Sequence, residues 1–290
     1  ILARRVPDHL EEIREHGIEP IDLVVVNLYP FKETIARNGI TMQEAIENID
    51  IGGPALIRAA AKNYTDVIVV VKAERYSEIL EHIKKGILSD EIRMDLAREA
   101  FCHTASYDSA VSNFLQKNLA TNTIFPETLQ ISVQRQQLLR YGENPHQQAA
   151  FYRDETVKGA CIANSIQLHG KELSYNNILD LNSALELVKE FDEPACVIIK
   201  HNNPCGTACA VDLFNAYMRA YEADPVSAFG GIVAFNRPVD KITAEEMSKI
   251  FLEAIIAPGF ETQALEVLKM RDNLRLMVAG NLNETSSDRL

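Results

Sequence analysis

The residues with the clearest potential for chemistry lie in the segment ACVIIKHNNPCGTAC, residues 195–209. Its apolar, β-branched start predicts a buried strand, and Lys200 and His201 stand where polar, turn-forming residues take over. In open α/β sheets, ligands gather beyond the carboxyl ends of strands. An imidazole can exchange a proton near neutral pH, and a neighbouring Lys cation favours its neutral, basic form. The alternative is a plain polar turn in which His201 is only hydrogen-bonded and Lys200 points to solvent.

Two cysteines follow in the string PCGTAC, at Cys205 and Cys209. Zinc-dependent nucleoside deaminases carry P-C-x-x-C, but the spacing here is one residue longer and no H-x-E precedes it. Buried free cysteines usually act as small apolar side chains. We therefore expect no metal site. A zinc deaminase is the alternative enzyme, and a metal assay would decide between the two.

Other motifs carry polar groups next to turns. Asp50 precedes Gly52-Gly53 and a predicted helix, so this turn either presents backbone N–H groups to an anion or simply caps the helix. Lys62 closes the same helix, roughly 13 Å along its axis from Pro54, so spacing alone does not join Lys62 to Asp50. Tyr29 is either an acid or a packed aromatic. Arg140-Tyr141 either holds a phosphate or lies exposed in a loop.

Alternating strands and helices must position these motifs. We expect strands over residues 21–28, 66–71, 129–139, 148–152, 196–199 and 231–235. We expect helices over residues 8–16, 31–37, 42–48, 54–62, 74–85, 89–116, 178–188, 212–223 and 243–251, with Thr41 and Thr243 as caps. The alternation predicts an α/β fold whose first sheet is mostly parallel. The polar stretch 117–128 predicts a boundary between domains 1–122 and 123–290.

Composition narrows the class of protein. The 290 residues are 47% hydrophobic and 24% charged, which is ordinary for globular domains. The formal net charge of -12 argues against nucleic acid or anionic membrane as a partner. Five cysteines without framework spacing, and no signal-peptide pattern, favour a reducing cytoplasm. The chain starts without Met, and we expect it to be a fragment of a longer protein.

The order of the motifs is more informative than any one of them. NLYPF is followed by IDIGGPALIRAAAKN, FCHTASYDSAVSNFL, LRYGENPHQ, LSYNNILDLNSA, KHNNPCG, DPVSAFGGIVAFN and IIAPGF. Over nearly its whole length, the chain resembles the bacterial family of bifunctional purine biosynthesis proteins that join AICAR transformylase to IMP cyclohydrolase. The resemblance implies an α/β chain with a methylglyoxal-synthase-like domain, followed by part of a cytidine-deaminase-like transformylase domain.

The resemblance implies that the first domain closes formyl-AICAR to IMP with loss of water. The carboxamide nitrogen attacks the formyl carbon of the same molecule, so holding the reactive conformer supplies much of the rate. By motif, Lys62 would be the acid/base group, and Tyr29 and Asp50 would orient and polarise the substrate. The implied nucleotide contacts are Val26, Asn27, Asp50 and Ile51.

The second domain, by the same resemblance, would transfer a formyl group from 10-formyltetrahydrofolate, a co-substrate, to the 5-amino group of AICAR. That amine is a poor nucleophile, so a base must remove its proton during attack. His201 would be the base and Lys200 its electrostatic partner, with no metal required. The positions that match the family's AICAR contacts are Arg140, Tyr141, Asn177, His201, Gly230 and Glu253.

Both ends of the family pattern are absent, including a K-T-L-H-P segment before residue 1 and the second half of the transformylase. We therefore expect neither site to be complete, and the fragment alone can be inactive. The resemblance also implies a homodimer that shares the transformylase site. Its other partners would be the small molecules AICAR, formyl-AICAR, IMP and folate. An alternative of another class is a catalytically inactive nucleotide-binding module, which would bind AICAR without turnover.

Overall fold

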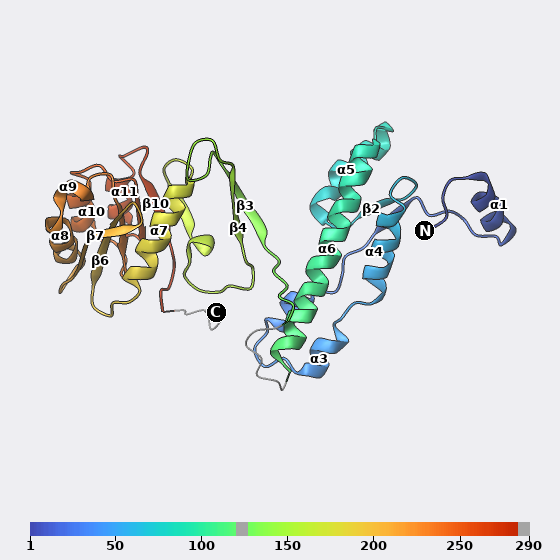
Figure 1. The fold of residues 1–290 in the computed structure, drawn as a ribbon, viewed down its shortest axis with the longest axis horizontal. Helices are drawn as coiled ribbons and strands as arrows, with labels where there is room; N and C mark the ends of the chain where they lie inside the picture. The colour runs from blue at the N-terminus through green and yellow to red at the C-terminus, as the bar shows by residue number, and fades with distance from the viewer. Residues whose placement is uncertain (120–126, 284–290) are drawn as a thin grey trace. The chain divides into compact units, whose positions relative to one another are not determined.

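The computed structural model describes residues 1–119 and 127–283. They belong to two compact units, residues 1–132 and 133–290 (Figure 1). Both units combine helices with strands, which agrees with the predicted α/β class. The predicted boundary at residues 122/123 lies outside the described residues and stays a prediction.

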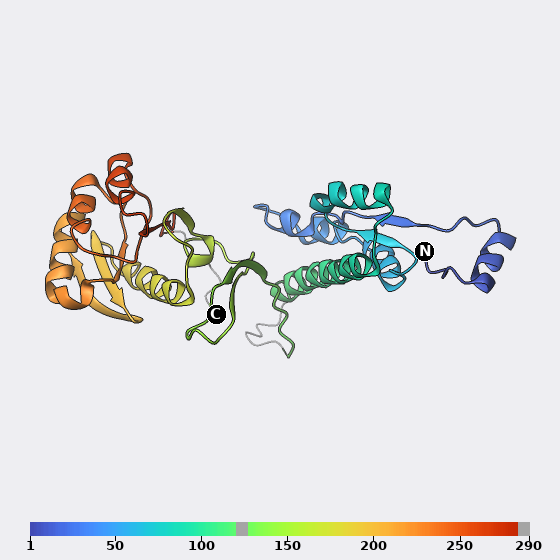
Figure 2. The ribbon, with the colours of Figure 1, turned by 90° about the horizontal axis from the view of Figure 1, so that it is seen from above.

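Unit 1, residues 1–132, has a parallel pair of strands as its centre, with Val24 opposite Val69. Its elements are α1 (Pro7–Glu15), β1 (Leu23–Val25), α2 (Phe31–Ile35), α3 (Met42–Glu47), α4 (Gly52–Lys62), β2 (Ile68–Val70), a 3-10 turn (Ala73–Arg75), α5 (Tyr76–Lys85) and α6 (Asp90–Lys117). Helices α4 and α6 pack against β2, and the long α6, green in Figure 2, runs beside the strands. Ile57, Val69 and Leu96 meet in this core.

Side-chain caps define the starts of α3 and α6 in unit 1. Thr41 caps α3, and Glu44 returns the hydrogen bond in a capping box, as predicted. Helix α4 begins at Gly52, so Pro54 is its third residue rather than its first. The predicted buried strand over 21–28 was too long. Only Leu23–Val25 is a strand, and Leu23 and Val25 are 42% and 47% exposed because one face of β1 has no described layer over it.

Unit 2, residues 133–290, is built on a six-stranded sheet of order β5-β10-β9-β8-β6-β7. Its strands are β5 (Ile166–His169), β6 (Ala195–Lys200), β7 (Asn203–Cys209), β8 (Ile232–Phe235), β9 (Ala254–Ala257) and β10 (Arg275–Val278). A separate antiparallel pair is formed by β3 (Gln134–Leu139) and β4 (Ala149–Arg153). The helices are α7 (Tyr175–Val188), α8 (Leu213–Ala223), α9 (Pro225–Ala228), α10 (Lys241–Met247) and α11 (Thr262–Leu268), with a 3-10 turn at Ile162–Asn164.

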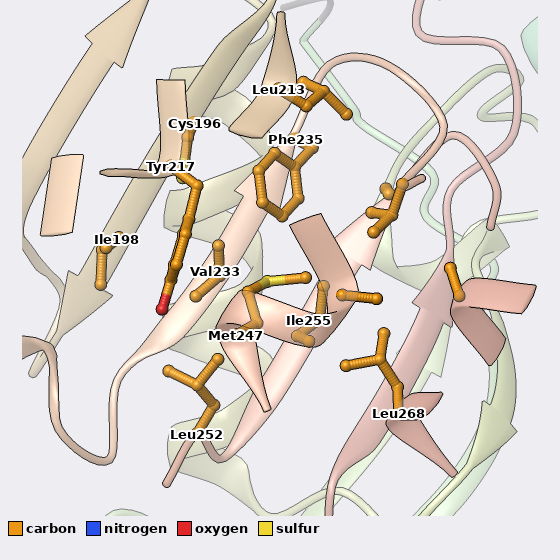
Figure 3. Close-up of a cluster of buried hydrophobic side chains, with 14 of the residues drawn as sticks. Cys196, Ile198, Leu213, Tyr217, Val233, Phe235, Met247, Leu252, Ile255 and Leu268 are labelled. Atoms are coloured by element: carbon orange, nitrogen blue, oxygen red, sulfur yellow. The ribbon is translucent and has the colours of Figure 1, made fainter. Parts of the chain in front are cut away.

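The central strands β6, β8 and β9 of the six-stranded sheet are buried on both faces. On one face, Tyr217 of α8, Met247 of α10 and Leu268 of α11 pack on Ile198, Phe235 and Ile255 of the strands (Figure 3). On the other face, α7 packs Leu181 and Leu185 against Val197 and Ile256. The apolar, β-branched strands predicted from the sequence are thus the middle layer of three.

Side-chain caps define the starts of these helices. Ser174 caps α7 and Asp212 caps α8. Asp240, not the predicted Thr243, caps α10, because its carboxylate accepts the Thr243 backbone N–H at 2.8 Å. Thr243 is fully buried in the first turn instead.

The turn after β6 differs from the expectation. The sequence predicted a chain break extending from Asn202 through Pro204 to Gly206. Instead, His201 and Asn202 alone form the turn, at φ 51° and 62°, and the chain returns at once as the antiparallel strand β7. Two positive φ values are the signature of a tight hairpin turn, and Asn tolerates them well. Pro204 fits within β7 because β7 is an edge strand.

Among the described residues, no helix combines the length and the apolar character needed to cross a membrane.

Candidate functional site

The register of unit 2 brings several predicted site residues to one edge of the sheet. Ile199 of β6 lies opposite Ile232 of β8, which lies opposite Ala254 of β9 and then Arg275 of β10. Lys200, the last residue of β6, and His201, the next residue, therefore lie at the edge where β8, β9 and β10 begin. The pair stands at the carboxyl end of β6, as expected, but β6 is antiparallel to both neighbours, so the same edge carries the amino ends of β8, β9 and β10. Adjacent strands lie about 4.8 Å apart, so this edge can line one ligand.

Backbone carbonyls and amides brace this edge. The Lys200 ammonium donates to the carbonyl oxygen of Phe229 at 2.7 Å, which ties β6 to the loop before β8. The Gly230 N–H donates to the carbonyl of Phe251 at 2.7 Å, and Gly230 has φ +73°, a conformation that favours glycine. The Glu253 N–H donates to the carbonyl of Gly231 at 3.0 Å. Gly230 and Glu253, both predicted substrate contacts, thus belong to the same hydrogen-bond network as Lys200.

His201 is exposed at the tip of the hairpin, and its backbone is fixed from several directions. The next residue, Asn202, donates its N–H to the Asp180 carboxylate of α7 at 2.8 Å, and its side-chain oxygen accepts from Ser183 of the same helix. The Asn203 amide donates to the carbonyl of His201 at 2.8 Å. The imidazole therefore stands on a rigid turn and is accessible to a ligand.

Glu253 forms an ion pair that the sequence did not indicate. Arg275 Nη1 lies 2.7 Å from Glu253 Oε2, and Arg275 Nε donates to the carbonyl of Glu172 at 3.2 Å. Glu253 directly precedes β9, and Arg275 begins the adjacent strand β10, so the register explains the contact. No local pattern joins positions 22 residues apart.

The two cysteines of PCGTAC do not form a pair of metal ligands. Cys205 packs on the face covered by α8, whereas Cys209 packs on the face covered by α7. Burial raises the pKa of the Cys205 thiol, and the Asp224 carboxylate acts in the same direction. No cluster of three or more potential ligands occurs within residues 1–119 and 127–283. The donor arrangement of this motif therefore does not fit the zinc deaminase alternative.

The remaining residues predicted for this site lie elsewhere in unit 2. Arg140 follows β3, with its guanidinium carbon 6.0 Å from the centre of the Tyr141 ring. Asn177 is buried, and its Oδ1 accepts from the N–H and hydroxyl of Ser174 at 3.1 and 2.9 Å in a capping box. Within the described residues, none of these side chains forms a hydrogen bond with Lys200 or His201. Their role as substrate contacts stays a prediction.

In unit 1 the loop before α4 is centred on Asp50. Its Oδ1 accepts the Gly53 N–H at 2.7 Å, and its Oδ2 lies 3.4 Å from the Tyr29 N–H that donates to it. The Asp50 N–H donates to the hydroxyl of Tyr107 at 2.8 Å, and that hydroxyl donates to the carbonyl of Asn48 at 3.3 Å. Burial raises the pKa of the Tyr107 hydroxyl. The contact of Tyr107 with this loop was not predicted from the sequence, because Tyr107 lies 57 residues from Asp50 in the chain.

The other residues predicted for this site are only partly brought together. Val26 extends β1 by donating to Val70 O at 3.2 Å, and Asn27 accepts from the Tyr76 hydroxyl at 3.1 Å. Ile51 lies 77% exposed beside Asp50. Lys62 ends α4, about 15 Å along the helix axis from its start, and is exposed. The structure joins Tyr29, Asp50 and Ile51 but leaves Lys62 apart from them.

Two family profiles match the chain. The profile described as "AICARFT/IMPCHase bienzyme" matches residues 60–290, and the profile "MGS-like domain" matches residues 2–55. The first covers most of the chain and includes every predicted site residue of unit 2, together with Lys62.

Curated relatives named "Bifunctional purine biosynthesis protein PurH" are similar over most of the chain. The protein from Thermoanaerobacter sp. (strain X514) is 57% identical over 272 residues, which are 93% of this chain and 53% of the relative. The protein from Ruminiclostridium cellulolyticum is 49% identical over 288 residues, 99% of this chain and 56% of the relative. The protein from Bacillus mycoides is 52% identical over 282 residues, which are 97% of this chain and 55% of the relative. The chain thus spans about half the length of these relatives.

A solved structure titled "Crystal structure of ForH" is 34% identical over 40% of this chain and 60% of that chain. Its TM-score of 0.36 is too low to support an argument about the fold. The family profiles and the curated relatives agree with each other and with the order of motifs. The chain belongs to the AICARFT/IMPCHase bienzyme family and begins with that family's MGS-like domain.

Proposed function

We propose that this chain is part of a bifunctional enzyme that completes IMP synthesis from AICAR. Unit 2 contributes to formyl transfer and unit 1 to ring closure. The observation that supports this best is the sheet edge of unit 2, where Lys200, His201, Gly230 and Glu253 gather from separate segments. Their types and order match the family's transformylase motifs.

In the transfer step, the 5-amino nitrogen of AICAR bonds to the formyl carbon, and the bond from that carbon to N10 of the folate breaks. His201 takes the proton that the amine loses, and that proton ends on the departing N10. The exposed imidazole on its fixed hairpin suits this role. Lys200 adds positive charge beside the site while its ammonium bonds to Phe229 O. A positioned general base contributes typically about 10²–10⁴-fold to a rate.

In the ring-closure step, the carboxamide nitrogen of formyl-AICAR attacks the formyl carbon and water leaves. The Asp50 loop holds the nucleotide, with Tyr29 and Ile51 beside it, and Lys62 exchanges the proton. Because Asp50 lies just before the start of α4 and Lys62 is its last residue, we place them at different parts of the bound nucleotide. Holding the reactive conformer is the main requirement of an intramolecular closure.

The co-substrate in this proposal is 10-formyltetrahydrofolate, and no metal takes part. The protein acts in the cytoplasm as a homodimer that shares the transformylase site. Sedimentation of the complete protein over a dilution series tests the dimer. A monomer with full transfer activity per chain at every concentration would contradict it.

The proposal is tested by supplying the complete protein with AICAR and formyl-labelled 10-formyltetrahydrofolate. We expect label in formyl-AICAR first and in IMP afterwards, and supplied formyl-AICAR alone should give IMP. Binding of AICAR without either product would instead favour a nucleotide-binding module. Release of ammonia from a nucleoside, dependent on zinc, would favour a deaminase.

A further inference from the structure

Arg275 ends the line of hydrogen bonds that braces the sheet edge of unit 2. The line runs from Lys200 through the loop before β8 to the start of β9. At its end, the Arg275 N–H donates to the carbonyl of Glu253 at 3.2 Å. The position of Glu253 therefore depends on Arg275 through the backbone as well as through the side chain.

The guanidinium of Arg275 is itself held in place. Its Nε donates to the carbonyl of Glu172, and its Nη1 lies 2.7 Å from Glu253 Oε2. The side chain of Arg275 is only 12% exposed, whereas that of Glu253 is 38% exposed. A planar guanidinium presents its donors in a rigid fork, so anchoring Nε also fixes the direction of Nη1. The carboxylate of Glu253 is thus oriented by a group that cannot easily turn.

The ion pair uses only one oxygen of Glu253. Within the described residues, Oε2 receives the guanidinium, and no hydrogen bond or ion pair engages Oε1. An ionised carboxylate offers two oxygens and accepts several hydrogen bonds. Oε1 is therefore available to a ligand at the same edge as Lys200 and His201.

We propose that Arg275 is a positioning residue of the formyl-transfer site. It orients Glu253 so that the second carboxylate oxygen accepts hydrogen bonds from the amino or hydroxyl groups of the nucleotide substrate. This inference rests on the proposed function, because it assigns a substrate-binding role to Glu253. The competing role for Arg275 is a brace between β9, β10 and the segment before α7, independent of Glu253's oxygen.

The test uses Arg275→Gln, Arg275→Lys, Glu253→Gln and the double variant Arg275→Gln/Glu253→Gln in the complete protein. The matched control is Arg237→Gln, because Arg237 also donates to backbone carbonyls, those of Asn236 and Asp192, but beyond the opposite end of β8. The readouts are KM and kcat for transfer, Kd for AICAR by calorimetry, the rate of ring closure and the thermal midpoint.

We expect Arg275→Gln and Glu253→Gln each to raise KM and Kd for AICAR about 10–100-fold, the range that loss of an orienting partner costs at metal sites. The double variant should be no worse than Glu253→Gln, because Arg275 acts through that residue. Arg275→Lys should lose less affinity for AICAR than Arg275→Gln. The KM and Kd of Arg237→Gln, and the rate of ring closure in every variant, should stay within about twofold of normal.

The inference would be overturned if the increases in Kd of the two single variants multiplied in the double variant. An unchanged Kd in Arg275→Gln would also overturn it. A parallel loss of ring closure and thermal midpoint would also overturn it, because it would identify a structural brace. The calorimetric Kd needs no turnover. A complete protein that binds AICAR but forms no product would therefore contradict the proposed function and still decide the role of Arg275.

Discussion

The two candidate sites are assembled in different ways. In unit 2, residues far apart in the sequence meet because four strands of one sheet start or end at the same edge. In unit 1, the sheet has two described strands, and the candidate residues lie at opposite ends of one helix, α4. Strand register fixes relative positions to within a few ångströms, whereas a helix separates its ends by its own length.

The two sites also differ in how they are held. Layers of helices cover both faces of the unit 2 sheet, and successive hydrogen bonds tie its edge together. The Asp50 loop of unit 1 depends on one buried hydroxyl, that of Tyr107, and on caps within the loop. We therefore expect substitutions at the unit 2 edge to act on chemistry, and those around Asp50 to act on the shape of the loop.

The largest effect is expected for His201→Ala in the complete protein. Loss of the general base should lower the rate of formyl transfer about 10²–10⁴-fold, while supplied formyl-AICAR still cyclises normally. Asn203→Ala, which removes a bond to the carbonyl of His201 but leaves the imidazole, is the matched control and should cost far less. A near-normal transfer rate in His201→Ala would show that His201 is not the general base.

Gly206→Ala tests how tightly unit 2 is packed. A Cβ there would lie 1.9 Å from the carbonyl oxygen of Ala220 in α8, so the helix itself must move. Overpacking of this kind costs typically about 1–3 kcal/mol or more. In unit 1, the three atoms nearest to a Cβ on Gly53 belong to the side chains of Leu28 and Asp50, so side chains rather than backbone would have to shift.

We therefore expect thermal unfolding of this chain to show a larger loss of stability for Gly206→Ala than for Gly53→Ala. Gly259→Ala, with nothing within 4 Å, should be nearly neutral. Equal losses for Gly206→Ala and Gly53→Ala would show that the two units are packed alike.

Tyr107→Phe should have the smallest of the three effects, and it should be confined to unit 1. The change leaves the Asp50 N–H without its partner, and because that bond is only part-buried we expect a loss of about 1 kcal/mol. In the complete protein, ring closure should slow while transfer is unchanged. Tyr76→Phe, which removes an exposed hydroxyl bond to Asn27, should cost less stability. Loss of both activities in Tyr107→Phe would mean that the two units are not independent.

Local patterns predicted the elements better than the contacts between them. The capping box at Thr41 and Glu44, the buried run of β2 and the amphipathic helix α7 depend on neighbouring residues, and the sequence shows them directly. The β6–β7 hairpin was missed because Pro204 and Gly206 are turn-forming residues that edge pairing and close packing against α8 hold in a strand.

The site residues also fall into those that local patterns predict and those that only tertiary contacts reveal. Lys200, His201 and Asp50 were predicted because each stands where an apolar run ends or just before a helix begins. Arg275 and Tyr107 contact the site across long stretches of chain, and only strand register and helix packing reveal them. Asn177 was predicted from its motif, but its contact with Ser174 was not, because Ser-x-x-Asn departs from the usual Ser/Thr-x-x-Glu/Gln pattern of a capping box.

The central claim is that each unit carries its own chemical step, and Lys62→Ala in the complete protein tests it most directly. Supplied with AICAR and 10-formyltetrahydrofolate, the variant should make formyl-AICAR at the normal rate and accumulate it, with little IMP. Arg58→Ala, in the same helix, is the control for damage to α4, because the Arg58 guanidinium lies over the Phe101 ring and is not among the predicted site residues. Equal loss of transfer and ring closure in Lys62→Ala would contradict the assignment of one step to each unit.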